Sequence, residues 1–292
     1  MGSPSSFVIR DLVNADGSAS ISDYGAHVLR WAPQGQPDVV WRPRSIYLKE
    51  GKAIRGGVPL IFPWFNSGYD PHDDAPKTPK HGFARSSFWH LDAGSFTDRH
   101  ARYTFDSDAI DAATLSQFVG NDAPRFHAVY EVTVGESITM ALTVTNDGDA
   151  AFSYEAALHT YLHVGDVMRA GVVGLDGADY LDTTLPGFPV HTQSGDVTFD
   201  GTMVDRIYLT DAPLELRDDV LGRTIESSTS GATATVVWNP GEQAGNAIGD
   251  LDAGEWRGFV CVEAAANRER LLTLQPGESH TIAQTLAVKE TR

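Results

Sequence analysis

Alternation of apolar and polar residues with a period of two constrains the fold of this chain most strongly. The clearest case runs over residues 137–145, whose apolar members share one face of an extended strand: Ile138, Met140, Leu142 and Val144. Similar short runs recur at 7–12, 28–32, 39–41, 102–105, 129–134, 233–238, 259–264 and 281–288. Gly, Pro, Asn and Asp separate them, as turn residues do. This pattern predicts an all-β chain folded as a large antiparallel β-sandwich or barrel.

Helical periodicity is confined to two short stretches, 108–118 and 243–248. The 28 Gly and 15 Pro are spread along the chain and do not gather in a linker, and no internal repeat is visible. We therefore expect a single domain over residues 1–292. The polar stretch 69–80 carries three prolines and is expected to form a surface loop.

The charge of the chain limits its partners. A net charge of −17 disfavours nucleic acid and anionic lipid surfaces, and an anionic small substrate would need a local cationic clamp. The one cysteine, Cys261, excludes an intramolecular disulfide and a Cys-rich zinc site, which fits a reducing compartment. No apolar run is long enough to span a membrane, and Met1–Ser6 has no signal-peptide pattern. We expect a cytoplasmic protein that acts as a monomer.

The stretch 54–65 is the first candidate for a site. Arg55 is followed by two glycines, which allow a tight turn or a close approach to a ligand. Pro59 and Pro63 interrupt an apolar run in a way that a central strand would not tolerate. The alternative is a strand entry with a glycine turn and a solvated Arg55.

The stretch 80–85 is the second candidate. Lys80, His81 and Arg85 put three cationic or ionisable groups into six residues of an acidic chain. Arg85 and Arg55 could form a planar clamp for a phosphate or carboxylate. The alternative is a surface basic patch paired with Asp73 and Asp74.

The stretch 152–164 is the third candidate. As a strand it places His159, Tyr161 and His163 on the face opposite its aliphatic residues, which suits a wet, sugar-sized cleft. His159 and His163 are four residues apart, roughly 13 Å along a strand, so they do not predict a shared zinc. The alternative is that either histidine is a hydrogen-bonded structural residue.

Glu263 is the sharpest single-residue feature, because it lies inside the apolar run 259–266. A charge is costly to bury there, so Glu263 needs a partner, a raised pKa or a catalytic role. The alternative is an edge strand whose glutamate faces water. Cys261 lies two residues earlier on the same face, and we interpret it as a packing residue and not as a nucleophile.

Together these stretches resemble the galactose mutarotase superfamily, and within it the hexose-6-phosphate 1-epimerases. The matching segments fall in the family's order and run from residue 55 to residue 263: 55–60, 81–85, 158–161, 237–240 and 260–263. The resemblance implies an antiparallel supersandwich that holds a sugar across a concave sheet, and a reaction that needs no cofactor. The spacing of His159 and His163 and the single cysteine argue against a metal site.

The resemblance also implies residue roles. His159 matches the family's general acid and Glu263 its general base, while Arg55 and Arg85 match phosphate-binding arginines.

Three further positions carry over from the same resemblance. Asp205 matches an aspartate that holds sugar hydroxyls, and His81 matches a histidine beside the sugar. Lys80 stands where the family often has Gln, and adds a cation. The aromatic pair Trp64 and Phe65 could stack on the sugar.

The implied activity is the interconversion of the α and β anomers of hexose 6-phosphates, with glucose 6-phosphate as substrate. One alternative is an aldose 1-epimerase that acts on unphosphorylated sugars and lacks the arginine clamp. Another is a non-catalytic sugar-binding sandwich that binds through Trp64, Tyr161 and His163. A glycosidase would usually need two carboxylates that flank the bond, and only Glu263 stands in a strong context, with Asp205 beside it as a weaker candidate.

Overall fold

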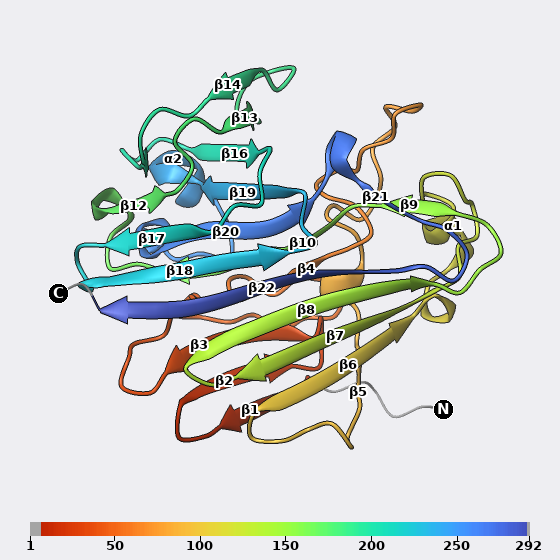
Figure 1. Ribbon diagram of the computed structural model, residues 1–292, viewed down its shortest axis with the longest axis horizontal. Coiled ribbons are helices and arrows are strands. Elements are labelled where there is room, and N and C mark those ends of the chain that lie inside the picture. Colours follow the sequence, from red (N-terminus) through yellow and green to blue (C-terminus); the bar gives the residue numbers. More distant parts are fainter. Residues whose placement is uncertain (1–6, 291–292) are drawn as a thin grey trace.

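Two large antiparallel sheets dominate the computed structural model, which describes residues 7–290 (Figure 1). The larger has nine strands, in spatial order β15 (Val197–Thr198), β12 (Ala170–Val173), β17 (Leu214–Asp218), β18 (Arg223–Ser230), β22 (Ser279–Glu290), β8 (Ser137–Asn146), β7 (Phe126–Val134), β6 (His100–Asp106) and β5 (His90–Leu91). In β8, buried residues alternate strictly with half-buried ones, as the sequence pattern predicts.

The second large sheet has eight strands and carries the candidate site. Its order is β14 (Val190–Thr192), β13 (Asp179–Asp182), β16 (Val204–Tyr208), β19 (Ala234–Asn239), β20 (Phe259–Ala266), β10 (Ala156–Leu158) and β4 (Leu60–Ile61), with β11 (Tyr161–His163) also paired to β20. The two-residue strand β4 lies at an edge between Pro59 and Pro63, as proline chemistry requires.

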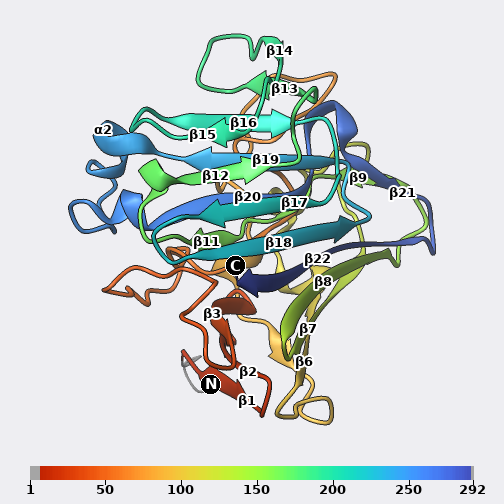
Figure 2. The ribbon, with the colours of Figure 1, turned by 60° about the vertical axis from the view of Figure 1, so that its left-hand side comes forward.

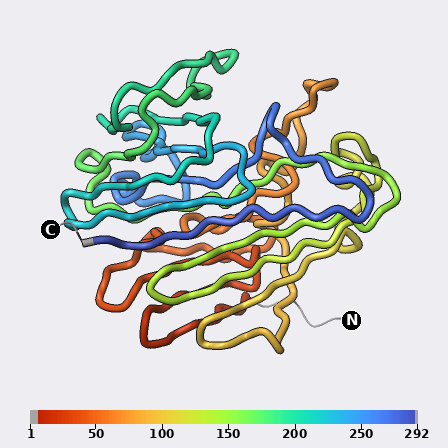
Figure 3. Tube along the Cα trace, in the orientation of Figure 1, coloured from red at the N-terminus to blue at the C-terminus, as the bar shows by residue number. Residues whose placement is uncertain are grey.

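Smaller elements complete the described chain. A three-stranded sheet joins β1 (Ile9–Val13), β2 (Gly17–Ser22) and β3 (His27–Pro33), and β21 (Leu272–Leu274) pairs with β9 (Phe152–Tyr154). The red strands of the first of these sheets lie beside β7, as the tube in Figure 3 shows. The helices are α1 (Ala112–Leu115), α2 (Gly241–Gly245) and 3₁₀ turns at Ala84–Ser86, Ser107–Ala109, Val167–Arg169, Glu255–Gly258 and Arg268–Arg270.

The all-β antiparallel prediction is confirmed, with local differences. The stretch 39–41 forms no regular strand and makes one bridge, from Val40 to Leu162. The expected helix over 108–118 is shorter, a 3₁₀ turn followed by α1, and 69–80 is an irregular loop. Within residues 7–290 no helix is long and apolar enough to cross a membrane. The expectation for Met1–Ser6 lies outside the described residues, and the single domain stays a prediction.

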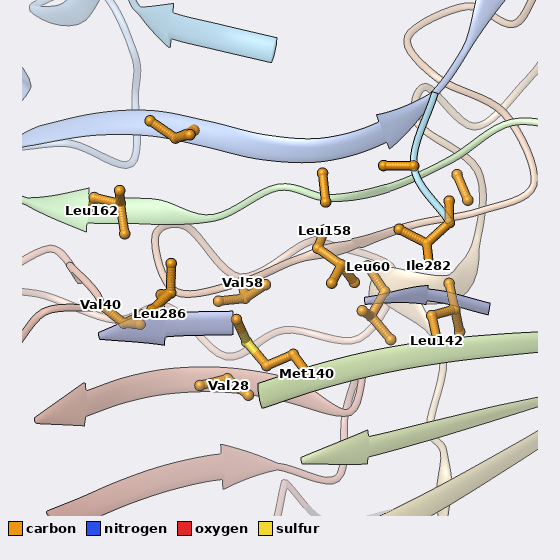
Figure 4. Close-up of a cluster of buried hydrophobic side chains, with 14 of the residues drawn as sticks. Val28, Val40, Val58, Leu60, Met140, Leu142, Leu158, Leu162, Ile282 and Leu286 are labelled. Atoms are coloured by element: carbon orange, nitrogen blue, oxygen red, sulfur yellow. The ribbon is translucent and has the colours of Figure 1, made fainter. Parts of the chain in front are cut away.

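The main hydrophobic core lies between the two large sheets, where β10 and β20 pack on β22 (Figures 1 and 2). Figure 4 shows side chains from both sheets and the intervening loops converging on it, among them Val58, Met140, Leu158 and Ile282. Burying this apolar surface is the dominant stabilising term for such a fold.

Strand alternation positions the site on the other face of the eight-stranded sheet. In β20, Val260, Val262 and Ala264 belong to the main core, so Cys261 and Glu263 point away from it. Residues 152–164 alternate between the core and the site face in the same way, although strand pairing is interrupted between β10 and β11. At this break the Thr160 hydroxyl donates to Gln284 of β22, on the core side, which leaves His159 on the site face.

Candidate active site

Seven side chains expected at the site line one cavity of about 220 Å³: Arg55, Lys80, His81, Arg85, His159, Asp205 and Glu263. Phe65, Asn66, Val236 and Trp238 complete its walls. The structure therefore brings together residues from strands β16 and β20 and from three loops. Their catalytic and binding roles remain predictions.

Glycines bring the two loop motifs against the sheet. Gly57 has φ +65°, and a Cβ there would overlap the His27 ring and the carbonyl oxygen of Val28. Gly82 has φ +70°, and a Cβ there would overlap the carbonyl oxygen of Phe62. The loop that begins at Arg55 is also tied to the histidine, because the His159 N–H donates to the Pro59 carbonyl at 3.1 Å.

Glu263 lies on a central strand, β20, between β19 and the β10–β11 segment. It is 1% exposed, which overturns the edge-strand alternative. Its Oε1 lies 3.3 Å from Nδ1 of His159, and its Oε2 has no hydrogen-bond partner within residues 7–290. Glu263 is thus a buried carboxyl group with one neighbour of complementary chemistry and a free oxygen at the cavity.

The surroundings shift the pKa of both groups in opposite directions. Burial raises the pKa of Glu263 well above its usual range, and the charge of Asp205 adds to this while Arg85 opposes it. Burial lowers the pKa of His159 to about 3, and the charges of Arg85 and Arg55 add to this. A carboxylate with a raised pKa is a stronger base than an exposed one, so the site favours proton transfer at Glu263.

His81 is held in one protonation form. Its Nδ1 accepts a hydrogen bond from the Asn66 N–H at 3.1 Å, so the ring proton is on Nε2. Burial, with the nearby charge of Arg85, lowers the pKa of His81 and keeps the ring neutral. His81 therefore offers a ligand in the cavity a neutral N–H donor.

The two arginines differ in how they are paired. Arg55 is held by Asp250, 3.0 Å from its Nε, and by the Tyr161 hydroxyl, 3.1 Å from its Nη1. Arg85 donates to the Lys80 carbonyl at 2.8 Å, and no carboxylate of the described chain lies within 4 Å of it. Pairing with Asp73 and Asp74 is therefore not found.

The position of Arg85 is electrostatically costly. Burial lowers the pKa of its guanidinium to about 10, and the charge of Arg55 adds to this, while the neighbouring Tyr161, Glu263 and Asp250 oppose the shift only in part. Both guanidinium groups also line an adjoining cavity of about 340 Å³, which Lys49 and Lys52 border. An anion placed between the two cavities would meet several cations at once.

Asp205, on β16, also lines the cavity. Burial raises its pKa, and the charge of Lys80 opposes this shift. Lys80 is exposed and lines the same cavity, so the cation at this position reaches the site.

The prediction that Trp64 stacks on the sugar is wrong. Trp64 is 1% exposed, donates from Nε1 to the Pro79 carbonyl and packs on Phe83 and Phe118, so it cannot stack on a ligand. Phe65 does line the cavity. The buried position of Trp64 weakens the sugar-binding alternative.

His163 is also absent from the cavity. It lines a separate cavity of about 690 Å³, and its Nδ1 is 2.9 Å from the Asp38 carbonyl oxygen. Tyr161 is buried, stacks on His159 and holds Arg55, so it supports the site from behind.

Two residues had no predicted role: Trp238, which lies in the matching segment 237–240, and Glu155. The ring of Trp238 packs edge-on against His159 with ring centroids 5.9 Å apart. Glu155 borders the next cavity, which shares Asp205 with the first. It lies in an apolar run, the same pattern that singled out Glu263.

Comparison with known proteins gives one consistent result. The family model described as "Aldose 1-epimerase" matches residues 11–287. A protein of Salmonella typhimurium named "Putative glucose-6-phosphate 1-epimerase" is 32% identical over 246 residues, which cover 84% of this chain and 78% of that protein. A protein of the same name from Escherichia coli K12 is 30% identical over 271 residues, covering 92% and 86%.

Solved structures agree on the fold. The crystal structure of a protein described as a putative mutarotase, from Salmonella typhimurium, superposes with a TM-score of 0.82 at 29% identity, over 97% of this chain and 90% of that one. A structure from Escherichia coli K12, described as a putative aldose 1-epimerase, has a TM-score of 0.75 at 14% identity, over 98% and 100%. The second likeness concerns the fold alone.

Proposed function

This chain belongs to the aldose 1-epimerase family, and from that premise we propose that it interconverts the α and β anomers of hexose 6-phosphates, with glucose 6-phosphate as its substrate. Curated relatives at 30–32% identity carry that substrate in their names. The cavity supplies an acid–base pair and a cationic end, which are the two features this reaction needs.

The chemistry requires proton transfers at two oxygens. Glu263 removes the proton of the anomeric hydroxyl while His159 gives a proton to the ring oxygen, so the ring C–O bond breaks and an aldehyde forms. Rotation about the C1–C2 bond turns the aldehyde over. On closing, His159 takes back the proton from the ring-forming hydroxyl and Glu263 returns one to the anomeric oxygen. One acid and one base complete the cycle, and no cofactor is needed.

A bound phosphate would also change the pKa of His159, the proposed acid. Burial is the main cause of the lowered pKa of His159, and Arg85 and Arg55 add to it; a bound phosphate dianion would offset the part due to the two arginines. The pKa of His159 would then rise toward the range in which an imidazole donates a proton. His81 and Asp205, on the walls of the same cavity, would hold the sugar hydroxyls.

Arg85 is the observation that favours a phosphorylated substrate over a free sugar. It is half-buried, lines the cavity beside Arg55 and has no carboxylate partner within the described residues. A phosphate accepts charge-assisted, bidentate hydrogen bonds from such groups. A free sugar offers no charge to satisfy them.

The direct test is anomer exchange, followed by NMR, with glucose 6-phosphate and with glucose at equal concentrations. We expect the exchange catalysed by the protein to be much faster for the phosphate ester. Equal or faster exchange of glucose would assign the chain to the unphosphorylated alternative. Absence of exchange with both sugars, in folded protein, would leave the non-catalytic alternative.

The proposal extends to the state of the protein, a cytoplasmic monomer with one domain. The cavity is built from one chain, and the only thiol is buried and unpaired, as suits a reducing compartment. Sedimentation of the purified protein tests the monomer, and a dimer would overturn it.

A further inference from the structure

Three side chains of metal-ligating type come together beside the cavity: His159 and Glu263 line it, and Cys261 is buried and does not. One nitrogen of His159, the Sγ of Cys261 and one carboxylate oxygen of Glu263 all lie within 4.8 Å of one another. His163, four residues along the chain from His159, takes no part, because it lies in another cavity. The set with Cys261 arises because residues 261 and 263 share a face of β20, and His159 lies opposite on the neighbouring segment.

The distances are compatible with a tetrahedral metal after a small movement of Cys261. Zinc bonds of 2.0–2.3 Å place neighbouring ligand atoms about 3.3–3.8 Å apart. His159 Nδ1 and Glu263 Oε1 are already 3.3 Å apart. Cys261 Sγ lies within 4.8 Å of the other ligand atoms and would have to approach them by up to about 1.3 Å, which a side-chain rotation can supply.

Free valences and charge also fit a divalent cation. Within residues 7–290, Nδ1 of His159 and Oε2 of Glu263 have no hydrogen-bond partner. Glu263 is also buried, so water does not satisfy its free oxygen. A thiolate and a carboxylate carry two negative charges, which one divalent cation neutralises. The thiol lies among Trp41, Tyr161 and Phe259, an apolar shell that strengthens a metal–thiolate bond.

The two arginines act in the opposite direction. Arg55 and Arg85 repel a cation, so a hard ion bound only through charge would be disfavoured. A borderline-soft metal that bonds to sulfur and nitrogen is the ion that this set selects. Magnesium and calcium, which prefer oxygen ligands, do not match it.

We propose that Zn²⁺, or another thiophilic divalent cation, binds His159, Cys261 and Glu263 and inhibits the enzyme in competition with the sugar. The fourth position of the metal opens on the cavity, where a water or a sugar hydroxyl completes the coordination. Inhibition follows because the metal holds the lone pairs that proton transfer requires. Only this consequence depends on the proposed epimerase activity, and metal binding itself does not.

Cobalt absorption tests binding without reference to activity. Since the chain has one cysteine, a thiolate-to-cobalt charge-transfer band from the full-length protein can come only from Cys261. We expect the band in the wild type, its loss on adding excess Zn²⁺, and its suppression by saturating glucose 6-phosphate. The matched variant Cys261→Ala keeps every histidine and carboxylate and should show no band.

Zinc inhibition of anomer exchange tests the consequence. The Cys261→Ala variant should exchange anomers normally but need about 10- to 100-fold more zinc for half inhibition, since even outer-shell partners of a metal site change affinity that much. A wild type without the thiolate band, or equal zinc sensitivity in both proteins, would overturn the proposal. If Cys261→Ala does not fold, the wild-type band and its competition by substrate decide. If no sugar is turned over, the band still tests the metal site, and the epimerase proposal fails separately.

Discussion

Two neighbouring regions on one face of the eight-stranded sheet each bury a glutamate, and they treat it differently. Glu155, 2% exposed, has both carboxylate oxygens occupied: Oε1 accepts the Arg268 N–H at 2.7 Å, and Oε2 accepts those of Phe65 and Tyr69 at 3.1 and 2.9 Å. Glu263, 1% exposed, has only His159 beside it and leaves one oxygen unpaired within residues 7–290.

This difference shows that burial does not by itself mark a catalytic acid or base. Burial raises the pKa of both carboxyl groups, but at Glu155 three backbone N–H groups oppose the shift. Through these hydrogen bonds Glu155 fixes the 65–69 loop and the turn at Arg268 to the sheet. Glu263 has no such donors, so its charge is free to change during a reaction.

The largest expected effect is on turnover at the unpaired glutamate. Glu263→Gln, which removes the base, should lower the rate of anomer exchange at least about 10²-fold, and His159→Ala should do the same. Thermal unfolding of Glu263→Gln should not become easier, because an amide is less costly to bury than a carboxylate. Near-normal exchange by a folded Glu263→Gln protein would show that Glu263 is not the base.

The matched substitution at Glu155 should lower the stability of the protein and not its turnover. Glu155→Gln replaces an acceptor of three N–H groups by an amide with one acceptor, and should lower the free energy of unfolding by about 1–3 kcal/mol. Exchange per folded molecule should change much less than in Glu263→Gln. Urea unfolding of the two variants beside the wild type checks this. Loss of turnover in a Glu155→Gln protein of unchanged stability would contradict the structural role of Glu155.

Replacing Arg85 should affect substrate use at the site of Glu263 and should not affect the region of Glu155. Arg85→Ala should weaken the use of glucose 6-phosphate by about 10- to 100-fold, because hydrogen bonds to charged groups contribute about 1.5–3 kcal/mol, and it should leave slow exchange of glucose nearly unchanged. Arg217→Ala, on the other sheet, makes the same change in net charge and serves as the control. Equal losses on both sugars, or none, would remove the phosphate clamp.

Much of the fold was predictable because side-chain alternation is a local property. Residues 137–145 carried enough apolar periodicity to specify β8, and the parity of 152–164 correctly separated His159 from the core face. Glu263 stood out for the same reason, since a glutamate in an apolar strand is visible without a structure. Pro59 and Pro63 similarly confined β4 to a sheet edge.

Residues outside that pattern depended on long-range packing. Nothing near Trp64 indicates that it is buried under Phe118, and nothing near Arg55 indicates Asp250 as its partner, 195 residues away. Glu155 had the same local pattern as Glu263. Its different role depends on N–H groups of two distant loops, which no strand pattern reports.

The pH dependence of stability can separate the two glutamates further. A carboxyl group whose pKa is raised in the folded state binds its proton more tightly there, so its contribution to stability falls as pH rises from about 4.3 through the raised pKa. The stability gained in Glu263→Gln relative to wild type should therefore grow with pH over this range, with a slope of at most about 1.4 kcal/mol per unit. Urea unfolding between pH 4 and 8 measures it. A difference that shrinks with rising pH would contradict the raised pKa.

The smallest expected effect is that of metal removal. The proposed cycle uses one carboxyl group and one imidazole, so dialysis against a strong chelator should leave anomer exchange unchanged, or raise it where zinc had occupied the site. Glu155 provides the internal comparison, because its three N–H partners leave it no role as a metal ligand. The stability that its hydrogen bonds contribute should therefore not change with the chelator. Stability should accordingly stay constant while exchange is measured before and after dialysis. Loss of exchange on chelation, restored by adding zinc, would mean that the set around Glu263 needs a metal for catalysis, and both the acid–base cycle and the inhibitory role of zinc would fall together.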